Sequence, residues 1–321
     1  MEKNVNQRVV AGVDIGGTKI AVGVVDSEGK VLARMEGPTE AKGPYRAAIE
    51  RTKDMLRAVV NKSGCEIAGI GIGSTGPIAP ETGQLGDVNH FPHWCGENPV
   101  KDLHEAFHLP VAVENDGDAA ALAEAAWGSG KNRSSVIYVT VGTGIGVGII
   151  LNGEVYRGVD QSHPEIGHHV IDSTGPLCDC GFQGCWESLA AGPALVRFFK
   201  ANVPENYPHR ESLTGREICE LARRGDEIAR KTVKREAHYL GLGLANLVTI
   251  FVPEAIVLGG SVMKSADLFL EDIRRIIAQS CRYVPHPRTE LRLASLGEDT
   301  NLIGAARVWY YRFGSGGNRV G

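Results

Sequence analysis

Three cysteines lie close together near the middle of the chain: Cys178, Cys180 and Cys185. Gly181 and Gly184 stand between them, which favours a tight turn over a helix or a strand. Three histidines precede this turn, and spacing alone does not choose among them: His163, His168 and His169. Thiolate and imidazole donors at this spacing suit a closed, tetrahedral Zn²⁺ site with a structural role. The alternatives are a loop with unrelated cysteines or a disulfide, and disulfides rarely persist in the cytoplasm, where we expect this chain.

A second group of polar residues follows a short apolar run, Val111–Val113, that predicts a strand. Glu114, Asn115 and Asp116 come next, directly before an Ala-rich segment that predicts a helix to about Trp127. The N-terminus of a helix favours an ionised carboxylate, which suits a general base. The commoner use of Asp at a helix start is as an N-cap, and the residues alone do not decide between the two.

Two glycine turns each join two apolar, β-branched runs: Asp14-Ile15-Gly16-Gly17-Thr18-Lys19 and Gly142-Thr143-Gly144-Ile145-Gly146. Because each turn joins strand to strand, neither is a dinucleotide-binding fingerprint, which needs a helix after the glycines. Backbone N–H groups and a hydroxyl in such a hairpin can still hold a phosphate. The repeat of the same hairpin in each half of the chain indicates a duplicated nucleotide-binding architecture.

Strands and helices alternate along the chain, which predicts an α/β fold with mixed sheets. Apolar periodicity predicts helices at 44–61, 100–108, 117–127, 193–200, 214–224, 226–248, 266–281 and 301–311. We expect a smaller N-terminal domain over 1–130 and a larger one over 131–299. A C-terminal helix at about 300–313 should pack back on the first domain, and 314–321 should be a disordered tail.

The composition is that of a soluble globular enzyme, with 43% hydrophobic and 22% charged residues among 321 and a net charge of −4. No run of Lys or Arg suggests nucleic-acid or membrane binding. We expect neither a signal peptide nor a membrane span, because no apolar run of the required length is present. A cytoplasmic location follows, and the remaining cysteines should be reduced: Cys65, Cys95, Cys219 and Cys281.

Together these stretches resemble the ROK family of sugar kinases, within the actin-like ATPase-fold superfamily. The segments that carry the resemblance occur in the family's order: 14–19, 114–116, 142–146, the EIGH of 165–168 and the CDCGFQGC of 178–185. The resemblance implies two domains around a cleft, with ATP on one side and a sugar at the bottom, and closure of the domains over the sugar. Some relatives are repressors with an N-terminal helix-turn-helix. Because so few residues precede the first predicted strand, we expect none here.

The resemblance implies transfer of the ATP γ-phosphoryl group to a sugar hydroxyl, with Asp116 as the general base. It assigns the sugar to Asp116 and a further set of residues: Gly76, Asn89, Asn115, Glu165, His168 and Glu187. His168 would be both zinc ligand and sugar neighbour, while His163 and His169 are interpreted as bystanders. Asp118 departs from the family, which often has Asn there, and would add negative charge near the base.

For ATP, the resemblance implies contacts from the glycine turns: Gly16, Gly17, Thr18, Lys19, Gly142, Thr143, Gly144, Gly259 and Gly260. Lys19 either contacts phosphate or is a solvated turn lysine. Asp14 is the carboxylate expected to lie near a phosphate-bridging Mg²⁺ without binding the ion directly. We expect glucose phosphorylation at the 6-hydroxyl, by a homodimer or homotetramer. N-acetylmannosamine, N-acetylglucosamine and fructose stay open as substrates, and so does a non-catalytic sugar-binding regulator.

Overall fold

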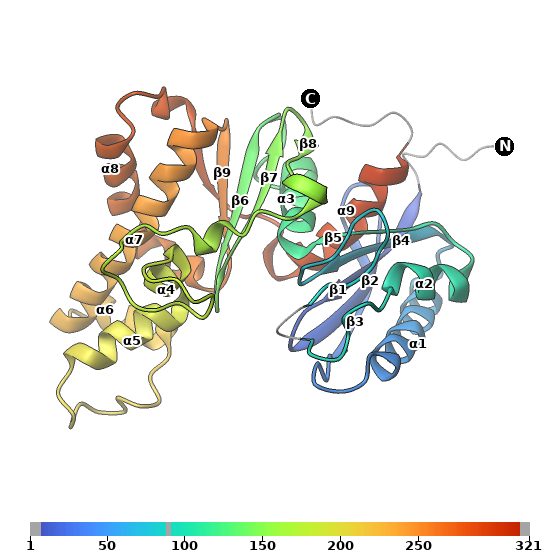
Figure 1. The fold of residues 1–321 in the computed structure, drawn as a ribbon, viewed down its shortest axis with the longest axis horizontal. Coiled ribbons are helices and arrows are strands. Elements are labelled where there is room, and N and C mark those ends of the chain that lie inside the picture. Colours follow the sequence, from blue (N-terminus) through green and yellow to red (C-terminus); the bar gives the residue numbers. More distant parts are fainter. Residues whose placement is uncertain (1–7, 88–90, 315–321) are drawn as a thin grey trace. The chain divides into compact units, whose positions relative to one another are not determined.

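The computed structural model describes residues 8–87 and 91–314 and divides the chain into two compact units (Figure 1). The first unit contains the chain up to Tyr138, the segment Gly148–Pro164 and the chain from Ala294 onward. The second unit contains Val139–Val147 and Glu165–Leu293. The predicted tail 314–321 and Asn89 fall, apart from Gly314, outside the described residues. No described helix is both long and apolar enough to cross a membrane.

The first unit is built on a five-stranded mixed sheet in the order β3-β2-β1-β4-β5. Its strands are β1 (Val9–Ile15), β2 (Lys19–Val25), β3 (Val31–Pro38), β4 (Ile67–Ser74) and β5 (Val111–Asn115). The hairpin β1–β2 and its neighbour β3 are antiparallel, whereas β4 and β5 run parallel to β1. The carboxyl ends of β1, β4 and β5 therefore lie at one edge of the sheet.

Helices cover both faces of this sheet. Side chains alternate along each strand, so successive apolar residues of β1 pack against helices on opposite faces. Ala11 and Val13 of β1 pack in one core with α1 (Tyr45–Ser63) and α2 (Pro99–Phe107). Val10 packs on the other face with Trp309 of α9 (Thr300–Phe313). Helix α3 (Asp116–Trp127) packs against α9.

Helix α9 lies unusually close to the strands. A Cβ atom added at Gly71 of β4 would lie 1.9 Å from the Ala305 carbonyl oxygen of α9, so only glycine permits this approach. Trp309 of the same helix is 1% exposed and donates its indole N–H to the Pro110 carbonyl, 3.2 Å away. The C-terminal helix is thus part of the scaffold that holds the ends of β4 and β5.

The second sheet has the order β10-β9-β6-β7-β8. Its strands are β6 (Val136–Val141), β7 (Ile145–Leu151), β8 (Glu154–Val155), β9 (Ala255–Gly259) and β10 (Glu290–Leu293). Read from β8, this order repeats that of the first sheet, with β6 and β7 in the places of β1 and β2. The duplication that the two glycine hairpins predict is therefore present in the strand order.

Five helices belong to the second unit: α4 (Trp186–Ala190), α5 (Gly192–Asn202), α6 (Gly215–Arg223), α7 (Glu227–Phe251) and α8 (Leu270–Ser280). The helix predicted over 266–281 is present as α8, but its predicted start is too early. Residues Val262–Leu268 form 3₁₀ turns with a non-helical Ser265, and the α-helix starts only at Leu270. The apolar spacing of this segment suits both conformations, so periodicity could not place the boundary.

Candidate active site and metal centre

The carboxyl ends of three parallel strands bring the predicted acidic residues of the first unit together. Asp14 of β1 pairs in register with Gly73 of β4, which pairs in turn with Glu114 of β5. One residue further along, Ile15, Ser74 and Asn115 form the next row. The chain leaves β4 and β5 here, so Thr75 and Asp116 follow at the same edge.

Asp116 is the first residue of α3, and its carboxylate is held from two sides. Its Oδ1 accepts a hydrogen bond from the Gly117 N–H at 2.9 Å, and its Oδ2 accepts one from the Thr75 hydroxyl at 3.2 Å. The N-cap is Asn115, whose side chain accepts from the Gly117 N–H at 2.8 Å. The cap interpretation therefore applies to Asn115, and Asp116 presents its carboxylate at the positive end of the helix.

Burial of carboxylates dominates the electrostatics of this edge. Burial raises the pKa of Asp116, and the hydrogen bonds from Gly117 and Thr75 and the charge of His163 oppose that shift. Burial and the neighbouring Asp116 raise the pKa of Asp14 to about 7. The protonation of Asp14 near neutral pH therefore depends on nearby positive charge, and burial shifts the pKa of Asp116 in the same direction.

A buried ion pair supports the end of β5. Arg157 donates from its Nε to Glu114 Oε2 at 3.1 Å and from its Nη2 to Glu114 Oε1, in a two-pronged contact. Glu114 is 2% exposed, and burial raises its pKa while the Arg157 guanidinium opposes the rise. The pair ties the segment after β8 to the strand that delivers Asp116.

Sequence reasoning missed three residues of this edge. Thr75 comes directly after β4, so the convergence of parallel strand ends was a usable signal for it. Arg157 and His163 lie more than 40 positions from their partners, |i−j| being 43 and 45, and no spacing rule indicates them. His163, interpreted as a bystander, bonds Asp118 in the structure.

The other predicted site residues of the first unit are Gly76 and those of the first glycine turn. Gly76 lies next to Asn115, since a Cβ added at Gly76 would be 3.0 Å from the Asn115 amide nitrogen. In the first glycine turn, the Gly16 N–H donates to the Lys19 carbonyl at 3.1 Å. The Lys19 ammonium is 3.0 Å from Glu36 on β3 and largely exposed. Gly17 and Thr18 complete that turn between β1 and β2.

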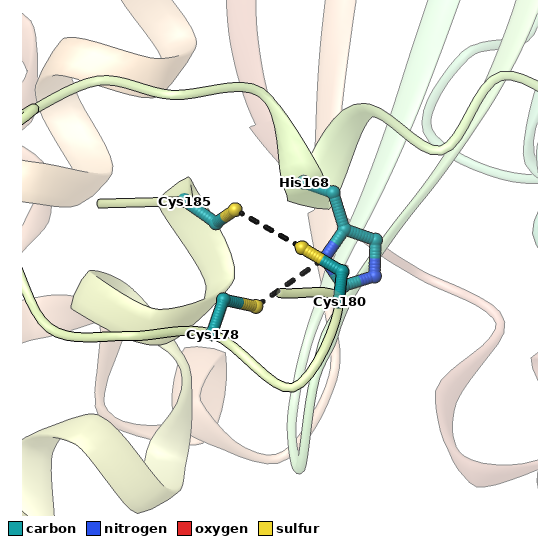
Figure 2. A group of neighbouring side chains, drawn as sticks. All are labelled: His168, Cys178, Cys180 and Cys185. Atoms are coloured by element: carbon teal, nitrogen blue, oxygen red, sulfur yellow. Dashed lines mark hydrogen bonds between the residues drawn. The ribbon is translucent and has the colours of Figure 1, made fainter. Parts of the chain in front are cut away.

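The cysteine loop of the second unit gathers four possible metal ligands: His168, Cys178, Cys180 and Cys185 (Figure 2). Their ligand atoms all lie within 4.8 Å of one another. Cys178 Sγ is 3.5 Å from His168 Nδ1. The sulfur atoms of Cys180 and Cys185 are 3.5 Å apart, which is too far for a disulfide bond. With Zn–S bonds of about 2.3 Å, a tetrahedral site has sulfur atoms about 3.8 Å apart. The donor set and its dimensions fit zinc.

Short backbone bridges fold this loop. The Cys178 N–H donates to the Phe182 carbonyl at 2.8 Å, and the Gly184 N–H donates to the Pro176 carbonyl at 2.9 Å. Of the adjacent histidines, His169 is engaged elsewhere, with its Nδ1 2.6 Å from the Ile166 carbonyl and its Nε2 3.2 Å from Asn246. His168 is the histidine that joins the cysteines.

Glu187, the second residue of α4, links the cysteine loop to the second glycine turn. Its Oε2 accepts from the Ile145 N–H at 2.8 Å. A Cβ added at Gly144 would lie 2.4 Å from that oxygen, so glycine is required for the contact. Glu165, at the other end of the loop, is exposed, and its carbonyl accepts from the His168 N–H at 3.0 Å.

A cavity of about 1140 Å³ opens within the second unit beside the second glycine turn. Gly142 and Thr143 line it together with Gly192, which starts α5, and Ser261, which follows β9. The predicted Gly259 and Gly260 are not among its lining residues; they carry the chain from β9 to Ser261. One acid lines the wall, Glu220, which pairs with Arg223. The basic side chains on the wall outnumber it: Arg197, Lys200, Arg216, Arg223 and Lys264. This volume and charge suit a phosphorylated ligand.

Comparison with known proteins agrees with these features. The sequence profile of the ROK family matches residues 10–311. A glucokinase of Streptomyces coelicolor is 37% identical over 92% of this chain and 95% of its own length. A xylose repressor of Bacillus spizizenii is 31% identical over 92% of this chain and 76% of its own length. The crystal structure of a ROK family glucokinase from Streptomyces griseus, in complex with glucose and AMPPNP, covers 93% of this chain and 98% of its own, with 34% identity and a TM-score of 0.78. The resemblance drawn from the sequence is confirmed, and this chain belongs to the ROK family.

Proposed function

We propose that this chain is an ATP-dependent sugar kinase that phosphorylates a hexose at its 6-hydroxyl, with glucose as the preferred substrate. The observation that carries the proposal is the Asp116 carboxylate, held by Thr75 and Gly117 where three parallel strands end. The glucokinase relative supports the sugar, and the Streptomyces griseus structure with glucose and AMPPNP supports the pair of substrates.

In this mechanism Asp116 accepts the proton of the attacking hydroxyl as the phosphoryl group is transferred. Its pKa is raised by burial, which makes the carboxylate a stronger base, while Thr75 and Gly117 keep it ionised and oriented. The rest of the barrier must be lowered by positioning of the substrates and by neutralisation of phosphate charge, since phosphoryl transfer needs little other chemistry from the protein.

The cavity beside Gly142 and Thr143 is the proposed site for ATP, because a glycine turn and basic side chains meet there. Asp14, in the first unit, fits a role near Mg²⁺. Its pKa is raised to about 7 by burial and by Asp116, so a divalent cation would stabilise the ionised forms of both carboxylates. Bound Mg²⁺ would neutralise phosphate charge during transfer.

The cysteine loop is proposed to hold one structural Zn²⁺ through His168 and the three cysteines. Four protein ligands leave no open position, so the metal would not take part in the chemistry. Its effect would be to fix the loop between Glu165 and Glu187, which we propose as sugar ligands. In the first unit we assign the same role to Gly76, Asn115 and Asp116.

The test is ADP release from ATP and Mg²⁺ with a panel of glucose, mannose, fructose, N-acetylglucosamine and N-acetylmannosamine. We expect the fastest turnover with glucose and a loss of about 10²–10⁴-fold in kcat in Asp116→Asn. Asp54→Asn is the matched control, because Asp54 is an exposed acid on α1, and it should behave like the native protein. If an N-acetyl sugar or fructose were turned over faster than glucose, that sugar would be the preferred substrate. If the Asp116→Asn protein were active, Asp116 would not be the base.

A second candidate is a sugar-binding regulator without catalysis, which the 31% identity to a xylose repressor favours. Calorimetric titration separates the two. Sugar binding without ADP release from any of the five sugars would support the regulator. Binding accompanied by Asp116-dependent turnover would exclude a purely regulatory role.

A further inference from the structure

His163 and Asp118 form a buried pair next to the proposed base. His163 Nδ1 lies 2.9 Å from Asp118 Oδ2, and the side chains are 13% and 2% exposed. Because a carboxylate can only accept, the imidazole donates this hydrogen bond. Asp118 Oδ1 is buried and has no hydrogen-bond partner among the described residues. The charge of Asp118 therefore has His163 as its hydrogen-bonded partner.

The surrounding charges make this pair important for Asp116. Besides Asp116, the acidic groups that face this edge are Asp14 on β1, Glu114 on β5 and Asp118 on α3. The basic groups are Lys19 beside Asp14, Arg157 and His163 after β8, and Arg312 of α9 beside Glu114. Glu114 is compensated by its two-pronged contact with Arg157. Asp14 and Asp118 both add negative charge near Asp116. His163 is the group whose positive charge acts on Asp116 directly.

We propose that His163 is a positioning residue for the Asp116 base: anchored by Asp118, its imidazolium offsets the negative charge of the neighbouring carboxylates and keeps Asp116 ionised. The inference rests on the proposed function, since it assumes that Asp116 is the base. It gives Asp118 a role in holding the imidazolium.

The physical reason is the balance of two opposite charges. A carboxylate at hydrogen-bonding distance favours the imidazolium form of histidine. The charge of His163 lowers the pKa of Asp116, and the charge of Asp118 raises it. While both charges are present they act on the pKa of Asp116 in opposite directions, and removal of the imidazolium alone leaves Asp118 as an uncompensated neighbour of the base.

The test separates charge from packing with His163→Gln, which keeps a hydrogen-bond donor for Asp118 and removes the charge. The acid limb of the pH profile of kcat/KM should move up by about 1 pH unit, because Asp116 must lose its proton to act. In an Asp118→Asn background the same substitution should shift the limb by less than half as much, since His163 has lost the carboxylate that favours its charge. His238→Gln, an exposed histidine on α7, is the matched control and should leave the limb unchanged.

The carboxyl ¹³C resonance of Asp116, assigned with Asp116→Asn, follows the titration without any turnover. An upward shift in His163→Gln supports the inference even if no sugar is phosphorylated, in which case only the proposed function fails. An unchanged titration of Asp116, or equal shifts in the native and Asp118→Asn backgrounds, would overturn it. If the glutamine variant does not fold, His163→Asn gives the same comparison.

Discussion

Replacement of Arg157 by Met tests whether the buried ion pair with Glu114 supports the edge that carries Asp116. Methionine keeps much of the apolar stem of arginine and removes both hydrogen bonds to Glu114. The Glu114 carboxylate, 2% exposed, is then left without a partner. Removal of one member of such a buried pair costs about 3–5 kcal/mol in the free energy of unfolding, because the remaining charge is desolvated and uncompensated.

The size of this loss depends on pH in a direction that the structure sets. Burial holds the pKa of Glu114 above its ordinary value of 4.5 in the folded protein, and the Arg157 guanidinium limits the rise. Without Arg157 the folded-state pKa rises further. A group with a raised folded-state pKa favours the folded state at low pH and loses that contribution as pH rises through the raised value. The Arg157→Met protein should therefore be least destabilised near pH 5, and each pH unit above that can add up to about 1.4 kcal/mol until Glu114 is fully ionised.

Urea denaturation followed by tryptophan fluorescence measures this loss in the relevant unit, since Trp94, Trp127 and Trp309 all belong to the first unit. Arg223→Met is the matched control. Arg223 makes the same two-pronged contact with Asp267, at 2.7 and 3.0 Å, but Asp267 is 60% exposed, and loss of an exposed pair changes stability by about 0–1 kcal/mol. If the two variants were equally stable at pH 8, or if the Arg157→Met loss did not shrink in acid, the reasoning from burial would be refuted.

Two further predictions concern the second unit. Metal analysis of the native protein should detect one zinc per chain. Cys178→Ala should lose this zinc and unfold at a lower temperature, whereas Cys65→Ala, outside the cluster, should keep it. A Cys178→Ala protein that retained stoichiometric zinc would contradict the assigned ligand set. Glu236 of α7 is fully buried, its two carboxylate oxygens have no hydrogen-bond partner among the described residues, and burial raises its pKa to about 8. The native protein should therefore lose stability as pH rises through about 8, and Glu236→Gln should lose less. Unfolding measurements on both proteins at pH 7 and pH 9.5 test this. Equal losses of unfolding free energy between the two pH values would disprove it.

Much of the fold follows from local sequence patterns. β-branched apolar runs predict β1, β2 and β6, and the Ala-rich run after Asp116 predicts α3, because these patterns suit one backbone conformation far better than the other. Where a pattern suits two conformations it fails to place the boundary, as at the 3₁₀ turns before α8. Strand ends also differ from the predictions: β5 continues through Asn115, because pairing with β4 extends past the apolar residues.

The candidate site was predictable to the extent that it depends on neighbours in sequence. Spacing singles out Asp116 at a strand end and the three cysteines within one short loop. It leaves open whether Asp116 is a base or an N-cap and which histidine joins the cysteines. The contact of Thr75 with Asp116 depends on the parallel order of β1, β4 and β5, which is a property of the sheet and not of either segment. The Arg157 and His163 contacts arise because the chain returns to the first unit within β7, at Gly148.

The residues that sequence reasoning missed share a physical cause. A buried carboxylate needs a cation or hydrogen-bond donors, and the folded chain supplies them from whichever segment packs nearby. From the sequence, Asp118 is a rival to Asp116 and a source of negative charge near the base, and His163 is interpreted as a bystander. They lie 2.9 Å apart. In the arrangement that we propose, the imidazolium of His163 balances the charge of Asp118 beside a carboxylate that must stay ionised to act. A change at one of the two positions is therefore expected to be tolerated best when the other changes with it, so an aspartate at position 118 is best explained together with the histidine at position 163.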